Sequence, residues 1–167
     1  MKVVIVGGGI SATALLCYFV REEPEWFAAQ EWLILEKSAR IGVGDLGKYK
    51  IRSNSVLPAF RSIIPPCVQL DPVLQALLDN VGQDYAPLAL VSEMMAGVAT
   101  CIVNRYDNVT AKTNSLVSFE DMESMEADCI VNATGAVQTI PSEYLCYRNV
   151  LTSTDVLCNS YDLSLIH

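Results

Sequence analysis

Apolar residues fall in short runs separated by glycine-rich and polar stretches, and this pattern predicts alternating strands and helices. Residues 2–6 (KVVIV) form a β-branched run typical of a strand buried on both faces of a parallel sheet. From Ile10, apolar residues recur at helical spacing until Pro24 stops the pattern. Residues 32–36 (WLILE) form a second buried strand. A strand, a helix and a strand in this order predict a βαβ unit with a right-handed crossover.

The remainder of the chain is less regular. Residues 37–58 carry three glycines and several polar residues, which predicts a long loop, and long loops are often functional. Residues 71–82 (DPVLQALLDNVG) have helix start and stop signals at both ends, and a further helix is expected over 87–95, ending at Gly97. Short β-prone pieces between 98 and 119 predict a small antiparallel β-meander, and residues 128–132 (DCIVN) predict another buried strand.

Length and composition narrow the class of protein. A chain of 167 residues fits one domain, so we expect a single domain over 1–167. With 11 Lys and Arg against 19 Asp and Glu, the net charge is −8, which argues against a nucleic-acid partner or an acidic membrane surface. The 51% hydrophobic content excludes global disorder.

Cysteine and histidine usage bears on metal and redox chemistry. The six cysteines form no C-x-x-C pair, and the single histidine, His167, cannot complete a Cys/His metal set. We therefore expect no metal site. Free cysteines inside apolar runs behave as small buried hydrophobes, which favours a reducing, cytoplasmic setting.

The strongest chemical signal is the stretch VVIVGGGISA at residues 3–12. Gly7, Gly9 and Ala12 match G-x-G-x-x-A directly after a predicted strand and at the start of a predicted helix, which is the context of a dinucleotide fingerprint. Gly7 permits the tight turn, Gly9 allows close approach of a pyrophosphate, and Ala12 lets helix and strand pack. The first amides of the helix, at its positive dipole end, would bind the diphosphate.

Glu36 closes the second predicted strand. In a βαβ unit this position lies at the sheet edge, where a carboxylate accepts hydrogen bonds from ribose hydroxyls and repels a 2′-phosphate. An exposed charge at a strand end is the alternative interpretation, and the fingerprint favours binding.

A third motif concerns the choice of dinucleotide. Residues 127–137, ADCIVNATGAV, resemble the Ala-Thr-Gly motif of flavoproteins. With the fingerprint and Glu36, the chain resembles the FAD-binding region of the two-dinucleotide-binding-domain flavoproteins, which include flavin monooxygenases and pyridine nucleotide oxidoreductases. The resemblance implies an α/β, Rossmann-like FAD/NAD(P)-binding domain and an FAD-dependent, monooxygenase-like oxidoreductase with NAD(P)H as co-substrate.

The resemblance also implies roles for individual residues. It assigns the FAD diphosphate to Gly7, Gly8, Gly9 and Ser11, beside the packing residue Ala12. It places Glu36 at the adenine-side ribose, Lys37 at the border of the adenine, and Thr134 and Gly135 in a turn close to the cofactor. The loop 40–54 would reach towards the flavin ring, where Ser53 and Asn54 are candidates for contacts; turn residues with no ligand would show the same pattern. The segment 149–157 resembles the stretch that leads towards the nicotinamide domain.

Several family features are missing from the sequence. No cysteine pair has the spacing of a redox-active disulfide, and no second dinucleotide fingerprint is present. We therefore expect an incomplete flavoprotein: a fragment, or one half of a split enzyme that associates with a second chain or with itself through an exposed apolar face.

Catalytic residues stay unassigned, because no side chain offers itself as acid, base or nucleophile. Two alternatives stay open. The chain could be a non-catalytic dinucleotide-binding or interaction module, or an NAD-dependent dehydrogenase domain, since Glu36 would serve NAD equally well.

Overall fold

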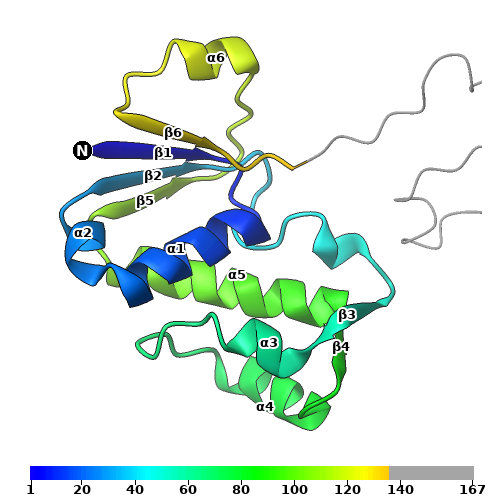
Figure 1. Ribbon diagram of the computed structural model, residues 1–167. Coiled ribbons are helices and arrows are strands. Elements are labelled where there is room, and N and C mark those ends of the chain that lie inside the picture. Colours follow the sequence, from blue (N-terminus) through cyan, green and yellow to red (C-terminus); the bar gives the residue numbers. More distant parts are fainter. Residues whose placement is uncertain (136–167) are drawn as a thin grey trace, which may run out of the picture.

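A four-stranded parallel sheet forms the centre of the computed structural model, which describes residues 1–135 (Figure 1). Its strands lie in the order β5-β2-β1-β6. Their bounds are β1 Lys2–Val6, β2 Glu31–Leu35, β5 Val109–Lys112 and β6 Cys129–Asn132. The register pairs Val3 with Trp32 on one side and with Cys129 on the other. Since β1 has a neighbour on both sides, four of its five residues are buried.

One face of the sheet is covered by helices. These are α1 (Ile10–Glu22), α2 (Pro24–Ala28) and α5 (Leu88–Arg105), and Figure 1 shows α1 and α5 lying below the sheet. Val3 and Ile5 point to this face and belong to a core that includes Trp32, whose ring stacks on Phe27 at 5.2 Å between centroids. Burial of these large side chains stabilises each by about 1.5–3 kcal/mol.

The opposite face has a thinner cover. Val4 and Val6, which alternate with Val3 and Ile5, pack with Leu35 against the segment between β5 and β6. This segment contains the short helix α6 (Phe119–Glu123), whose N-cap Ser118 and Asp121 form a capping box. The connection from β5 to β6 therefore passes over the face that α1 and α5 leave open (Figure 1).

A second group of elements lies beyond α5. It comprises the 3₁₀ helix η1 (Leu46–Lys48), strands β3 (Arg52–Val56) and β4 (Tyr85–Pro87), and helices α3 (Leu57–Arg61) and α4 (Pro72–Val81). β3 and β4 pair antiparallel as a separate sheet. A cluster of buried side chains joins this group to α5; its fully buried members are Leu57, Leu78, Ala86, Val91, Met94 and Met95.

Several predicted elements are confirmed. The strands at 2–6, 32–36 and 128–132 are present with bounds shifted by at most one residue. The helix predicted at 71–82 is α4; Asp71 caps it by accepting hydrogen bonds from the amides of Val73 (2.9 Å) and Leu74 (3.3 Å), and Gly82 ends it with φ +63°. The α/β class is thus confirmed.

The predicted antiparallel meander over 98–119 is wrong. Residues up to Arg105 continue α5, and β5 pairs parallel with β2. The β-branched residues near position 100 suggested a strand, but Val91, Met95, Val98 and Ile102 follow a helical period and are all buried, so burial of that stripe outweighs local strand propensity. The antiparallel pair is instead β3–β4, and β3 lies inside the predicted loop 37–58.

Gly97 does not end α5, as the sequence predicted. It lies in the interior of the helix, where a Cβ would come within 3.1 Å of Leu70 Cδ2 and 3.4 Å of Leu74 Cδ2. Glycine is therefore used for close packing, although it costs about 1 kcal/mol relative to alanine in a helix.

α5 is also the one helix among residues 1–135 that is long and apolar enough to cross a membrane by length and composition. Eight of its residues are buried within the protein. Core helices of soluble proteins meet the same criterion, so this is weak evidence for a span.

Candidate functional site

The carboxyl ends of β1, β2 and β6 meet at one edge of the parallel sheet. Just beyond the strands, the amide of Gly7 donates to the carbonyl of Leu35 (2.8 Å), and the amide of Ala133 donates to the carbonyl of Val6 (2.7 Å). The glycine-rich turn, the start of the loop after β2 and the turn after β6 are therefore neighbours, although they come from three separate parts of the sequence.

The glycine-rich turn is packed tightly between its neighbours. Gly7 has φ +95°, and a Cβ there would overlap the carbonyl of Ala133 and lie 2.7 Å from the amide nitrogen of Thr134. A Cβ on Gly8 would lie 3.0 Å from Cβ of Glu36. The strand ends thus approach the turn too closely for a side chain at position 7.

Glu36 links the turn to the loop that follows β2. Its side chain is only 6% exposed; Oε2 accepts a hydrogen bond from the amide of Gly8 (2.6 Å), and Oε1 accepts one from the amide of Ser38 (2.7 Å). A carboxylate can accept about four hydrogen bonds, and these two amides use one on each oxygen of Glu36.

The first turn of α1 presents unsatisfied amides at this edge. Gly9 is the N-cap and provides no side-chain cap, and the first helical hydrogen bond runs from the amide of Thr13 to the carbonyl of Gly9 (3.0 Å). Among residues 1–135, the amides of residues 9–12 have no hydrogen-bond partner. No acidic side chain lies in this turn itself, and its amides at the positive end of the helix dipole suit an anion.

The turn after β6 runs beside Gly7. Thr134 donates from its amide (3.2 Å) and its hydroxyl (2.8 Å) to Oδ1 of Asn132. Gly135 has φ +77°, and a Cβ there would meet no described atom within 4 Å. This turn is held by a local side chain, and no atom of residues 1–135 crowds it at Gly135.

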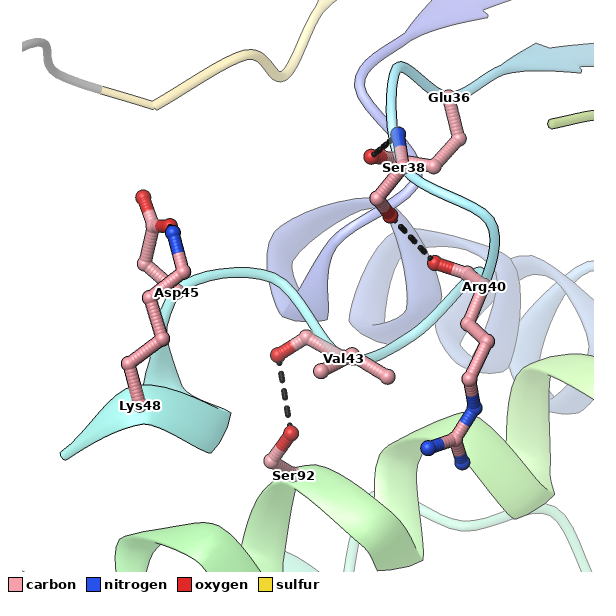
Figure 2. Close-up of polar contacts among 7 residues, drawn as sticks. All are labelled: Glu36, Ser38, Arg40, Val43, Asp45, Lys48 and Ser92. Carbon is pink, nitrogen blue, oxygen red and sulfur yellow. Dashed lines mark hydrogen bonds and ion pairs between the residues drawn. The ribbon is translucent and has the colours of Figure 1, made fainter. Parts of the chain in front are cut away.

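The loop after β2 is tied to α5. Figure 2 shows Ser38, Arg40 and Val43 along this loop, with the Arg40 side chain directed towards α5. The Ser38 hydroxyl donates to the Arg40 carbonyl (2.9 Å), and the Ser92 hydroxyl of α5 donates to the Val43 carbonyl (3.0 Å). The Arg40 guanidinium forms a two-pronged ion pair with Glu93 of α5 (3.0 and 2.7 Å).

Charged groups follow at the end of this loop. Lys48 Nζ pairs with Asp45 Oδ1 at 2.6 Å (Figure 2). The hydrogen bond from Lys48, with a smaller contribution from the charge of Lys37, keeps the pKa of Asp45 below its usual value. Asp45 is therefore ionised at neutral pH, and Lys48 neutralises its charge.

The structure places the remaining predicted site residues as follows. Ser11 is exposed on the first turn of α1 and Ala12 is buried beneath it, while Lys37 is exposed next to Glu36. Ser53 and Asn54 lie on β3 in the second sheet, apart from the strand ends.

The Ser53 hydroxyl is engaged within its own strand. It donates to the carbonyl of Ser55 (2.6 Å) and accepts from the amide of Ser55 (2.8 Å). A local turn accounts for its polarity without a ligand.

Sequence reasoning missed the residues that hold the loop after β2, above all Gly42, Gly44 and Ser92. Their partners lie far away in the sequence, and only the glycines at 42 and 44 gave a local signal. Gly42 has φ +81°, and a Cβ there would come within 2.5 Å of Ala96 Cα on α5.

The chemistry available at this edge is binding chemistry. Amides, the Glu36 carboxylate and the exposed Lys37 can hold an anionic ligand with a ribose, and among residues 1–135 no group of three His, Cys, Asp or Glu side chains is placed to hold a metal ion. Burial in the α1 core raises the pKa of the Cys17 thiol to about 12, so this cysteine is not a nucleophile at neutral pH.

A hollow of about 770 Å³ lies elsewhere, along the outer side of α5 and the segment before α4. Arg40 and Glu93 line one part of it, and Asn104 and Arg105 line another. It is shallow and open, and neither the glycine-rich turn nor Glu36 lines it, so we do not assign it to the site at the sheet edge.

Comparison of the chain with models of protein families, with curated proteins and with solved structures finds no match in any of the three.

Proposed function

We propose that this protein binds an adenine dinucleotide, FAD in the first place, at the carboxyl edge of its parallel sheet. The observation that carries the proposal is the combination of the amides at residues 9–12, which have no partner within the described part of the chain, with the Glu36 carboxylate, which itself bonds to the turn that leads into those amides. A diphosphate suits the amides and a ribose diol suits the carboxylate.

The strand order supports the same proposal. Numbered along the chain, β5-β2-β1-β6 is 3-2-1-4, the order in which the Rossmann-type sheet begins. In that plan the connections after the first and fourth strands leave in opposite directions, and ligands bind in the crevice between them. Here these strands are β1 and β6, whose following turns contain Gly7 and Thr134.

The residues present fit the parts of FAD in different degrees. The amides of the first turn of α1 would hold the diphosphate, Glu36 would hold the ribose, and Thr134 and Gly135 would border the ligand where the structure leaves space. In a flavoprotein of this kind the bound flavin supplies the chemistry that passes electrons from NAD(P)H to an acceptor. The preference for FAD over NAD rests on the Ala-Thr-Gly stretch.

A second candidate function is a non-catalytic module that associates with another chain. The observation in its favour is the exposure of large apolar side chains on the thinly covered face, where Leu116 is 82% and Phe119 is 67% exposed. Exposed apolar groups of this size favour association.

Calorimetric titration of the purified protein with FAD, NAD and ADP tests the proposal. We expect saturable one-to-one binding, tightest for FAD, that weakens in Glu36→Ala but not in Glu25→Ala, which removes an exposed carboxylate on α2. No heat and no shift in melting temperature with any of the three ligands would reject dinucleotide binding. Binding of NAD in preference to FAD would indicate a dehydrogenase domain instead.

A further inference from the structure

The loop after β2 lies between helices α5 and α1. On one side, Gly42 lies against the backbone of α5, where only glycine leaves room beside Ala96. On the other side, Gly44 lies against the start of α1, because a Cβ on Gly9 would come within 3.4 Å of the Cα of Gly44. A Cβ on Gly44 would likewise lie 3.6 Å from the amide nitrogen of Ile10.

This loop is also bonded to the glycine-rich turn. The amide of Gly42 donates to the carbonyl of Gly8, while the amide of Gly8 donates to Glu36. Both polar groups of the Gly8 backbone are therefore engaged: the amide bonds to Glu36, just after β2, and the carbonyl bonds to Gly42 in the loop. Any movement of the loop changes the surroundings of the amides at residues 9–12, which follow directly.

Ser92 holds the loop from below. Its side chain is fully buried on α5, and its hydroxyl donates to the Val43 carbonyl at 3.0 Å (Figure 2). A Cβ on Gly47 would lie 3.0 Å from the same hydroxyl oxygen. The buried hydroxyl thus bonds to Val43 in one limb of the loop, and the absence of a side chain at Gly47 leaves room for it beside the other limb.

The position of Ser92 has a consequence for binding. Removing its hydroxyl leaves the Val43 carbonyl without this donor and opens a space under the loop, so the neighbouring Gly44 loses an anchor that keeps it beside Gly9 and Ile10. A binding site loses affinity when the residues that support its contacts are released, even if those residues never touch the ligand.

We propose that Ser92 is a positioning residue for the dinucleotide site, acting through Val43 to keep Gly44 against the first turn of α1, where a diphosphate would bind. This inference rests on the proposed function. It assigns α5, a helix that contributes no residue to the sheet edge, a specific part in binding.

Ser92→Ala and Ser92→Cys test the inference, with Thr100→Ala, an exposed position on the same helix, as the matched control. Ser92→Cys keeps a side chain of similar size but makes only a weak hydrogen bond, so it separates the effect of the hydrogen bond from the effect of packing. It also keeps the test possible if Ser92→Ala fails to fold. Two measurements are made on each variant: calorimetric titration with FAD and ADP, and hydrogen exchange of the amides at 8–12 and 42–47.

We expect both Ser92 variants to weaken FAD and ADP about 3- to 10-fold, the loss that corresponds to one buried hydrogen bond, and to exchange faster at 42–47. Thr100→Ala should match the wild type in both measurements. Wild-type exchange in both Ser92 variants would show that the hydroxyl does not hold the loop. Faster exchange with unchanged affinity would overturn the positioning role while leaving the proposed function intact.

Absence of binding by the wild type would reject the proposed function, and the positioning role with it. The exchange rates would still decide whether Ser92 holds the loop, so the two failures are distinguishable.

Discussion

Two glycine-rich segments meet at the sheet edge, and they depend on glycine for different reasons. The first, Gly7–Gly9, lies at the strand ends: a Cβ on Gly7 would overlap the backbone that follows β6, and a Cβ on Gly8 would crowd Glu36. The second, Gly42–Gly47, lies between helices α1 and α5. The first can be recognised from the local sequence, because a strand, three glycines and a helix follow one another directly. The second has partners about fifty residues away, so its role emerges only from the fold.

Gly7→Ala should have the largest effect on the first segment. A Cβ at φ +95° is strained, and it would overlap a carbonyl held in place by strand pairing, so we expect a loss of about 3–5 kcal/mol in the free energy of unfolding. Urea denaturation measures it. Gly135→Ala is the control, since it has the same sign of φ but open space, and should lose only about 1–2 kcal/mol. Equal losses in the two variants would mean that crowding at Gly7 is unimportant.

Gly42→Ala makes the corresponding test in the second segment. The overlap with Ala96 is similar, but the loop can shift away from α5, so we expect a smaller loss of about 2–3 kcal/mol. The shift would move Gly44, and dinucleotide affinity should fall together with stability. Gly82→Ala, which also has positive φ but only a 3.9 Å contact, controls for backbone strain. If Gly42→Ala lost more free energy of unfolding than Gly7→Ala, the second segment would be the more rigid of the two.

Glu36→Gln addresses the bond between the first segment and β2. The amide group of glutamine cannot accept from both Gly8 and Ser38, and one buried amide is left unsatisfied, which costs about 1–3 kcal/mol. Denaturation should show this loss, and calorimetry should show weaker binding of ligands that carry a ribose. Glu93→Gln, at an exposed carboxylate, should lose less than 1 kcal/mol. A neutral effect of Glu36→Gln would mean that the carboxylate does not hold the turn.

The sequence predicted the first segment well and the second poorly. The strand at 2–6, the turn at Gly7–Gly9 and the strand end at Glu36 follow from local patterns, and so does α4 with its caps at Asp71 and Gly82. Their signals are hydrophobic period, glycine position and capping chemistry, all of which act over a few residues.

The errors have a common physical cause. The sequence predicts a helix that ends at Gly97 and is followed by strands, because glycine disfavours helix and β-branched residues favour strand. In the structure, burial of the apolar stripe of α5 outweighs these local preferences. The anchoring of the loop by Ser92 could not be inferred, since a serine within a helix carries no sign of a partner at Val43.

The ion pair between Arg40 and Glu93 should have the smallest effect. Both side chains are about half exposed, so a double-mutant cycle with Arg40→Ala and Glu93→Ala should give a coupling of about 0.2–1 kcal/mol. A coupling well above this would show that the second segment depends on charge as well as on Ser92.

The pH dependence of that coupling has a definite sign. The hydrogen bond from Arg40 lowers the pKa of Glu93 from its ordinary value of 4.5. The folded state therefore releases this proton at lower pH than the unfolded state. The coupling should be complete above about pH 5 and should disappear as the pH falls through the lowered pKa. Repeating the cycle at successively lower pH checks this, and a coupling that stays constant after Glu93 has become protonated would not come from the ionised pair.

The two contacts of α5 with the loop lie one helical turn apart, at Ser92 and Ala96. Deleting a single residue between them would rotate Ser92 by about 100° around the helix axis relative to Ala96, and the loop could not follow both. A deletion before Ser92 does not change the angle between Ser92 and Ala96 around the helix axis. Natural or engineered changes of length should therefore be rejected between positions 92 and 96, where this one turn of helix fixes the spacing of both contacts.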